Sequence, residues 1–297
     1  MRFLATGEEM QKIDQISIEQ IGIPGLVLME RAALAVTEEI EKRFSRIKTG
    51  EHDTGRTAYT RILVVTERGN NGGDGLAVAR MLAEKGYLVD VYCIGQVSRA
   101  TESYKVQESI LGQLGIKITE DFPNGEYDVI VDAIFGVGLK RDIEGIHKEV
   151  IDHINDMPAY VVAVDIPSGI SATTGRVMNV AVKADLTVTM GLMKVGMTVY
   201  PGHGYCGEIL VKDIGFPDKA VDMVMPEIFT YDEGDLNRLN KRRPDGNKGT
   251  FGKVAVIAGS QEISGAACLA ASAAYRVGSG GRTGYKSKWH TPMRSAR

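Results

Sequence analysis

The 297-residue sequence is poor in cysteine and lacks any paired cysteine pattern. Cys93, Cys206 and Cys268 are far apart along the chain, and none belongs to a CxxC motif. This spacing argues against a disulfide framework and against a cysteine zinc site. Unpaired cysteines are typical of a reducing compartment, so we expect a cytoplasmic protein.

The sequence also lacks a long apolar run and a strong excess of one charge. No hydrophobic run is long enough to cross a bilayer, and the amino terminus becomes acidic at Glu8 and Glu9, too early for a signal peptide. The formal net charge of −3 gives no reason to expect nucleic acid or an anionic membrane as a partner. With 43% hydrophobic and 25% charged residues, the composition is that of a soluble globular protein.

Short β-branched runs alternate with helical patterns from Arg61 onward. This alternation indicates βαβ units and a parallel sheet that is covered on both faces. We therefore expect an α/β fold, a three-layer α/β/α Rossmann-like doubly wound sheet, over residues 1–222. The expected strands are 61–66, 87–93, 128–132, 160–164, 185–190 and 208–213, and the expected helices between them are 74–85, 102–114 and 144–155.

Two more helices are expected before this alternation begins. Thr6 and Glu9 have the spacing of a capping box, which predicts a helix that ends before Gly22. A second helix is expected over residues 26–44, where apolar residues recur at helical intervals. Residues 45–60 are polar and without pattern, and we interpret them as an exposed connection.

Three unusual loops follow expected strands. Residues 69–75 read Gly-Asn-Asn-Gly-Gly-Asp-Gly, residues 132–141 contain an aspartate, two glycines and a Lys-Arg pair, and residues 165–169 read Asp-Ile-Pro-Ser-Gly. The first is neither the dinucleotide fingerprint nor a Walker loop, because its glycine spacing differs and no Lys-Ser/Thr follows. Loops at the carboxyl edge of a parallel sheet lie close together, so we expect the three to form one ligand site.

The side chains of these loops suggest separate roles. Asn71, Asp132 and Ser168 offer oxygen ligands with little charge, which suits a monovalent cation better than calcium or zinc. Lys140 and Arg141 provide positive charge for a phosphate. Asp165 is placed to transfer a proton or to accept hydrogen bonds from ligand hydroxyls, although an aspartate at a strand end is also a common capping residue.

At these loops, and at residues 25–32, the sequence resembles the NAD(P)H-hydrate epimerase family. The similarity covers residues 1–222. In that family, hydrated NADH or NADPH is interconverted between its R and S forms at ring carbon 6. The resemblance implies potassium ligands Asn71, Asp132 and Ser168, a homodimer, and Asp165 with Lys140 as the catalytic candidates. It also implies that the hydrated cofactor is bound by Asn70, Asn71, Gly72, Gly73, Asp74, Gly136, Val137, Gly138, Leu139, Lys140, Arg141, Asp142 and Asp165.

The carboxyl-terminal part resembles the start of the ADP- or ATP-dependent NAD(P)H-hydrate dehydratase domain, which has a ribokinase-like fold. The matching segments are residues 248–260 and 265–280. We expect an incomplete domain at 223–281 and an aberrant or disordered tail at 282–297, because the pattern stops near Gly280. Dehydratase activity and ADP or ATP binding are therefore expected to be absent.

Two other functions compete with epimerisation. A non-catalytic cofactor-binding or dimerisation module of the same fold would not need all three loops. A conventional nicotinamide oxidoreductase is disfavoured, because GxGxxG is missing and no acidic residue ends the strand that contains Cys93.

Overall fold

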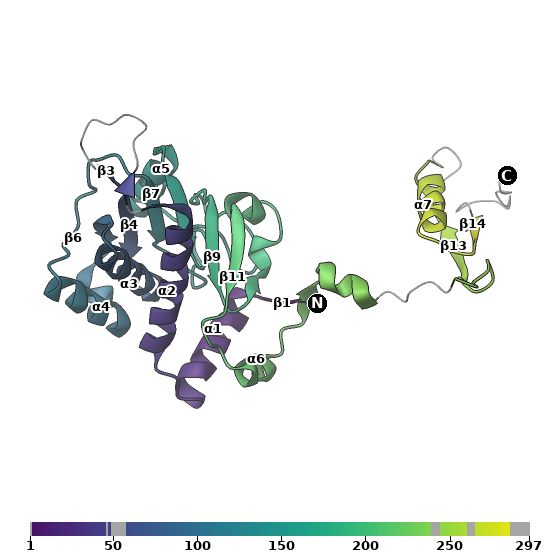
Figure 1. The fold of residues 1–297 in the computed structure, drawn as a ribbon, viewed down its shortest axis with the longest axis horizontal. Helices are drawn as coiled ribbons and strands as arrows, with labels where there is room; N and C mark the ends of the chain where they lie inside the picture. The colour runs from purple at the N-terminus through teal and green to yellow at the C-terminus, as the bar shows by residue number, and fades with distance from the viewer. Residues whose placement is uncertain (1, 46, 49–57, 239–243, 260–264, 286–297) are drawn as a thin grey trace. The chain divides into compact units, whose positions relative to one another are not determined.

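The computed structural model describes residues 2–45, 47–48, 58–238, 244–259 and 265–285. The chain divides into two compact units, Met1–Asp232 and Glu233–Arg297. The elements of the first unit position the candidate site, and Figure 1 labels them.

The first unit is built on a seven-stranded sheet in which every neighbouring pair is parallel. The strand order is β11-β9-β8-β7-β4-β5-β6, which confirms the expected α/β class. The sheet brings together strands that are far apart in sequence, and three neighbours at its centre precede the three expected loops. The strands are β4 (Arg61–Glu67), β5 (Leu88–Ile94), β6 (Ile118–Thr119), β7 (Val129–Ala133), β8 (Tyr160–Val164), β9 (Leu186–Met190) and β11 (Glu208–Lys212).

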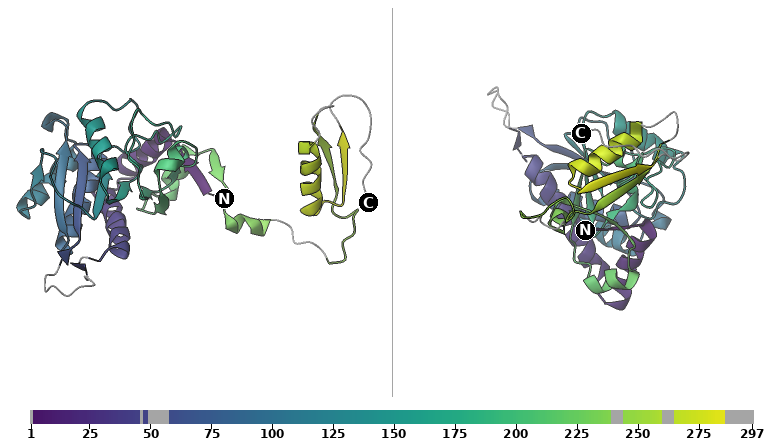
Figure 2. Two further views of the ribbon diagram at one scale, coloured as in Figure 1. Left: turned by 90° about the horizontal axis from the view of Figure 1, so that it is seen from above. Right: turned by 90° about the vertical axis from the view of Figure 1, so that its right-hand side faces the viewer.

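Both faces of the sheet are buried, because alternate residues of each central strand point to opposite sides. In β4, Ile62 and Val64 belong to one core cluster, whereas Leu63 and Val65 belong to another. The first cluster is covered by α2 (Gly25–Arg43), α3 (Asn70–Glu84) and α4 (Glu102–Gln113), and the second by α5 (Ile146–Asp156). Figure 2 shows helices on both sides of the strands.

The amino-terminal helix forms where the capping box predicted it. Thr6 Oγ1 accepts from the Glu9 N–H at 3.2 Å, and a Glu9 side-chain oxygen accepts from the Thr6 N–H at 2.7 Å. The helix α1 (Gly7–Gln15) continues into a π-helical turn, η1 (Ile16–Gln20). Each backbone donor at the start of a helix lacks an internal partner, so the capping box stabilises the point at which α1 begins.

A small second sheet was not expected from the sequence. Its strand β1 (Arg2–Ala5) pairs in parallel with β10 (Met193–Lys194) and in antiparallel with β12 (Ile228–Thr230). Strands of two to four residues are too short to show an alternating pattern, and their pairing depends on contacts distant in sequence. This sheet carries the first unit past the expected boundary at residue 222.

The remaining elements are short. β2 (Ile47–Lys48) and β3 (Ala58–Tyr59) form an antiparallel pair within the expected connection at 45–60, of which 46 and 49–57 lie outside the described residues. The other short elements are η2 (Val97–Arg99), η3 (Val195–Met197), η4 (Gly202–Tyr205) and α6 (Asp218–Val224).

The second unit contains η5 (Glu233–Arg238), β13 (Lys253–Ile257), α7 (Gly265–Arg276) and β14 (Gly281–Tyr285). β13 and β14 are parallel neighbours. Residues 282–285 of the expected tail thus belong to β14. Backbone groups supply the hydrogen bonds of a strand, so pairing with β13 does not require an apolar pattern. Residues 286–297 lie outside the described part of the chain.

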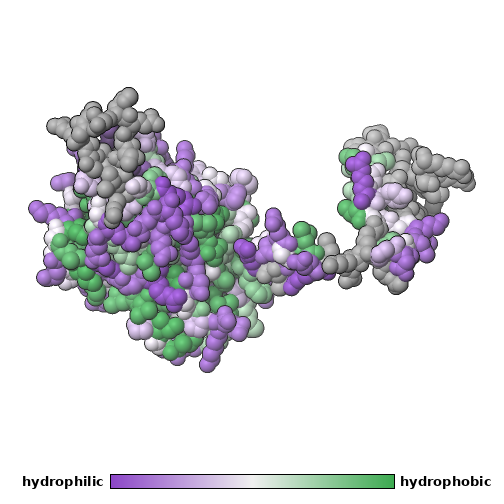
Figure 3. Space-filling model, viewed as in Figure 1, coloured by the Kyte–Doolittle hydropathy of each residue, from purple (hydrophilic) through white to green (hydrophobic). Residues whose placement is uncertain are grey.

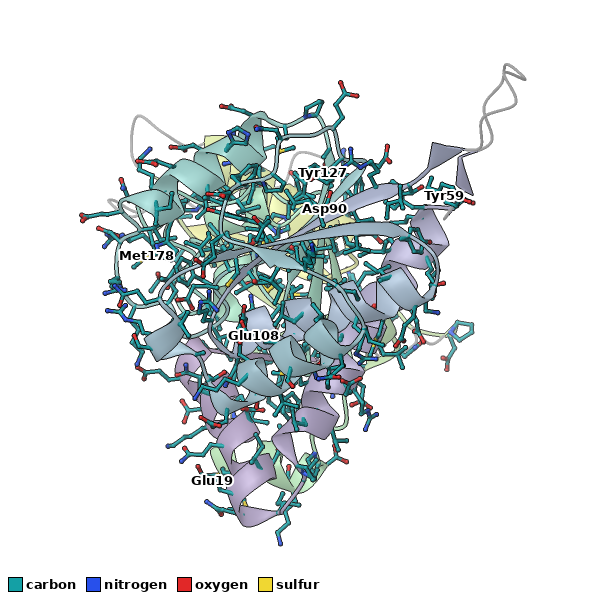
Figure 4. The ribbon with its side chains drawn as sticks, turned by 90° about the vertical axis from the view of Figure 1, so that its left-hand side faces the viewer. Glu19, Tyr59, Asp90, Glu108, Tyr127 and Met178 are labelled. Carbon is teal, nitrogen blue, oxygen red and sulfur yellow. The ribbon has the colours of Figure 1, made fainter. Side chains whose placement is uncertain are left out.

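Polar side chains at the amino ends of the strands form a hydrogen bond and an ion pair with one another. The Tyr127 hydroxyl donates to Asp90 at 2.8 Å, and Arg61 pairs with the same carboxylate at 3.0 Å (Figure 4). Burial and then Asp90 raise the pKa of Tyr127 to about 12. These groups hold the edge of the sheet that lies opposite the three loops.

The surface of the first unit mixes polar and apolar residues. On the face that Figure 3 displays, hydrophobic residues lie in patches between hydrophilic ones. Within the described ranges, no helix combines the length and the apolar character that crossing a membrane requires.

Candidate active site

A cavity of about 700 Å³ opens at the carboxyl edge of the large sheet. Its walls come from α1, from the start of α2, from the amino-terminal turns of α3, and from the segments that follow β7, β8 and β9. All of these lie between Met10 and Phe216, within the first unit. The three loops that the sequence singled out thus contribute to one cavity, as expected for a parallel sheet.

The first loop differs from the expected turn, because α3 already begins at Asn70. A Cβ on Gly72 would lie 1.6 Å from the Glu67 carbonyl oxygen, and one on Gly75 would lie 2.5 Å from the Ala133 Cβ. Gly73 packs in the same way against Met29. The glycines therefore allow α3 to pack against the sheet and α2, and Gly72 and Gly73 are not among the residues that line the cavity.

Three polar residues of the first loop do line the cavity, namely Asn70, Asn71 and Asp74. Asn71 Nδ2 is buried and has no hydrogen-bond partner in the described structure. Such a donor is costly to leave unpaired, so it marks a place where a hydrogen-bond acceptor of a ligand is expected. A Cβ on Gly136 would come within 3.3 Å of Asn71 Oδ1, so glycine at 136 leaves room for this amide.

Asp132 and Ser168 join the second and third loops. Ser168 Oγ donates to Asp132 Oδ1 at 2.6 Å, and the Ser168 N–H donates to Oδ2 at 2.8 Å. The Phe135 N–H donates to Ser168 Oγ at 2.8 Å. Burial raises the pKa of Asp132 to about 6, although the bonds from Ser168 and the Ile134 N–H oppose that rise.

Asp165 adopts a left-handed backbone conformation, with φ at 69°. This conformation is uncommon for a residue other than glycine, asparagine or aspartate. The Asp165 N–H donates to the Val188 carbonyl at 2.8 Å, and the Met190 N–H donates to Asp165 Oδ1 at 3.2 Å. Asp165 is one of the residues that line the cavity.

The cation in contact with Asp165 is Lys194, which the sequence analysis missed. Its ammonium group is fully buried and hydrogen-bonded to Asp165 Oδ1. Burial lowers the pKa of Lys194, whereas Asp165 opposes the decrease. A lysine inside the otherwise apolar segment 192–197 was the available signal, because buried lysines normally need a partner.

Lys140 lies elsewhere in the cavity wall. Its Nζ pairs with Glu8 at 3.2 Å, and both side chains are well exposed. The described contacts of Asp165 thus include Lys194 and not Lys140. An exposed pair of this kind contributes little to stability, so Lys140 remains available to a ligand.

Two further carboxyl groups face Asp165 from the helices. Burial raises the pKa of Asp74 well above its usual range, and the charges of Asp165 and Asp14 raise it further. Burial also raises the pKa of Asp14, with Asp165 adding to the shift. Asp14 was not predicted, although its position four residues after Met10 places both on the same face of α1.

The rest of the second loop divides between two cavities. Gly136, Val137, Gly138, Leu139, Lys140 and Arg141 line the large cavity, as expected. Asp142 does not, and it accepts two hydrogen bonds from Arg176 at 2.8 and 3.0 Å. It borders a neighbouring cavity of about 230 Å³. The expectation that Asp142 contacts the ligand is therefore not supported by its position.

Residues 25–196 match the family described as YjeF-related protein N-terminus. The chain belongs to this family. A protein of Limosilactobacillus fermentum named NAD(P)H-hydrate epimerase is 44% identical over 70% of this chain and 95% of its own length. A protein of the same name from Leuconostoc mesenteroides is 41% identical over 78% of this chain and 96% of its own length.

Longer relatives match both units. The protein named bifunctional NAD(P)H-hydrate repair enzyme Nnr of Moorella thermoacetica is 36% identical over 94% of this chain. The chain spans about half of that relative, 53% of its length. The crystal structure of yeast ynu0, YNL200c, has a TM-score of 0.62 and 24% identity over 78% of this chain and 97% of its own, which supports the fold.

Proposed function

We propose that the chain interconverts the R and S forms of hydrated NADH and NADPH. The observation that carries the proposal is the carboxylate of Asp165 in the wall of a 700 Å³ cavity, on a chain that aligns with nearly the whole length of two proteins named NAD(P)H-hydrate epimerase. A cavity of this volume is within the range that small-molecule sites occupy.

The reaction requires proton transfer in both directions. Epimerisation at ring carbon 6 proceeds either by opening of the hydrate ring or by loss of its hydroxyl group, followed by closure or addition on the other face. Either route needs one group that accepts a proton and one that donates it. Asp165 is the proposed base, and Lys140, which is exposed at the cavity wall, is proposed to contact the substrate.

The substrate is proposed to bind along the polar part of the cavity. Asn70 and Asp74 at the start of α3 and the segment 136–141 offer amide, carboxylate and backbone groups to it. Arg141 is proposed to contact a phosphate of the dinucleotide. Gly72, Gly73 and Asp142 are left out of this proposal because they lie outside the cavity wall.

We propose potassium as the ion held by Asn71, Asp132 and Ser168. The residues present fit a monovalent cation, since they combine amide, carboxylate and hydroxyl oxygens. Bound potassium would neutralise the carboxylate charge of Asp132. In the described part of the chain, no group of three or more His, Cys, Asp or Glu residues could hold a metal ion.

The proposal is tested by adding purified protein to an isomerically pure hydrate and following the R-to-S ratio. We expect the ratio to move to equilibrium, and to move faster in potassium than in a matched lithium buffer. An unchanged ratio at high protein concentration would contradict epimerisation and favour the non-catalytic binding module. The hydrate kept without protein controls for spontaneous epimerisation.

The second unit is proposed to be the start of a ribokinase-like dehydratase domain. The Moorella relative, which is named a bifunctional enzyme, matches across this unit. In α7, Leu269 and Tyr275 are 74% and 64% exposed. A two-stranded sheet with an uncovered helix provides little core, so we expect no ADP- or ATP-dependent dehydration of the hydrated cofactor.

A cytoplasmic homodimer is likewise a proposal. Cell fractionation tests the location, and sedimentation tests the oligomeric state.

A further inference from the structure

Lys194 is held in one position by three hydrogen bonds. Its Nζ donates to Asp165 Oδ1, to Thr189 Oγ1 at 2.7 Å and to the Met190 carbonyl at 2.9 Å. A lysine ammonium has three donors, so these bonds use all of them. The side chain is fully buried, and Lys194 is among the residues that line the cavity beside Asp165.

The hydrogen bonds to Asp165 are divided unevenly between its two carboxylate oxygens. The hydrogen bonds that the structure shows to this carboxylate come from Lys194, Thr189 and the Met190 N–H, and all three reach Oδ1. Oδ2 receives none of them. The carboxylate is thus fixed through one oxygen, while the residue lines the cavity.

The charges around Asp165 come from three other elements. Asp14 of α1 and Asp74 of α3 are carboxyl groups that line the same cavity and interact electrostatically with it, and Lys194 of β10 is the cation in contact with it. Three neighbouring carboxyl groups cannot all carry charge at low cost, because like charges disfavour ionisation. Of the three, Asp165 is the one that the structure shows in direct contact with a cation.

We propose that Lys194 is a positioning residue that holds Asp165 through Oδ1 and leaves its Oδ2 to accept a proton from the substrate. This inference rests on the proposed epimerase function. In the ring-opening route, Asp165 takes the hydroxyl proton at carbon 6, the bond from carbon 6 to the ring nitrogen breaks with its electron pair going to nitrogen, and Asp74 gives that nitrogen its proton. Rotation of the aldehyde and the reverse transfers close the ring on the other face.

The test compares Lys194→Met with wild type for R-to-S interconversion between pH 5 and pH 9. Methionine keeps the length of the side chain and removes the charge. We expect kcat at neutral pH to fall about 10-fold or more, KM to change by less than about 2-fold, and the acidic limb of the pH–rate profile to move up by about one pH unit. Lys212→Met is the matched control, because Lys212 pairs with Glu39 outside the cavity. This variant should leave the acidic limb of the pH–rate profile at the wild-type pH.

A second variant covers the case in which Lys194→Met does not fold. Thr189→Val removes the hydroxyl that joins Lys194 to Asp165, and we expect a smaller shift of the acidic limb in the same direction. An acidic limb that stays at the wild-type pH in folded Lys194→Met, or in Thr189→Val where only that variant folds, would overturn the inference. Failure of the wild type itself to move the isomer ratio would instead contradict the proposed function.

Discussion

At the scale of single residues, the site depends on polar groups that are buried despite the free-energy cost of removing them from water. Asp165 adopts an unusual backbone conformation and contacts a buried lysine. Asn71 keeps a buried amide without a partner, and the pKa of Asp132 is raised to about 6. Unusual conformations and raised carboxyl pKa values concentrate at functional sites, because binding and proton transfer require groups that folding alone would not favour.

We predict that Asp165→Asn lowers epimerisation by about 100-fold or more while the protein stays folded. Asparagine tolerates the left-handed conformation almost as well as aspartate, so the backbone should not change. The measurement is turnover of pure hydrate, with circular dichroism to verify folding. Asp142→Asn is the control, because Asp142 pairs with Arg176 outside the large cavity. Equal loss of turnover in both variants would contradict a specific role for Asp165.

At the scale of elements, the close approach of α3 to the sheet depends on small residues. A Cβ at Gly75 would lie 2.5 Å from the Ala133 Cβ and 2.9 Å from the Thr66 Cγ2. We predict that Gly75→Ala destabilises the protein by about 1–3 kcal/mol through overpacking. Chemical denaturation measures the change in the free energy of unfolding.

The matched control for that substitution lies in α4. Gly112→Ala adds the same methyl group in an exposed helical position with no atom within 4 Å, and should stabilise the protein by about 0.5–1 kcal/mol. Opposite signs at the two positions would support the packing role of Gly75. A stability change of the same sign at both would contradict it.

Glu39 connects α2 to β11 through a buried ion cluster. Burial raises its pKa, but hydrogen bonds from Lys212, Lys42 and Arg43 outweigh burial and lower the pKa to about 2. Since this is below the usual value of 4.5, the stabilisation is fully present above pH 4.5 and is lost as pH falls toward 2.

We predict that Glu39→Gln is less stable than wild type at pH 7, and that the difference narrows between pH 4.5 and pH 2. Urea unfolding of both proteins across this range is the measurement. Gln15→Ala removes only an exposed contact to Glu19 and serves as the control with a small effect at every pH. A difference between Glu39→Gln and wild type that does not depend on pH would contradict the assigned ion cluster.

At the scale of the whole molecule, the candidate site belongs to one unit. Every residue that lines the large cavity lies between Met10 and Phe216, and the first compact unit extends to Asp232 because β12 pairs with β1. Catalysis at this cavity should therefore be independent of the second unit.

We predict that a chain ending at Asp232 epimerises the hydrate with the same kcat and KM as the full chain, within about 2-fold. A chain ending at residue 222 serves as the comparison, since it removes β12 and part of α6, and we expect it to be less stable. Thermal unfolding and turnover of the three proteins test this prediction. Loss of turnover in the longer fragment would show that the second unit takes part in the site.

The sequence by itself determined the alternating order of strands and helices, the two faces of the sheet and the position of three unusual loops. These features follow from local patterns, namely short β-branched runs, helical stripes and the capping box at Thr6. The carboxyl edge of a parallel sheet then required the loops to lie together. The family resemblance depended on the same residues.

Only the tertiary structure decided which groups touch. It placed Lys194 against Asp165, moved Lys140 to an exposed contact with Glu8 and brought Asp14 into the cavity. It also showed that the glycines of α3 serve packing, because a neighbouring strand occupies the space that a side chain would need. Contacts between residues far apart in sequence leave no local pattern, so these assignments required the folded chain.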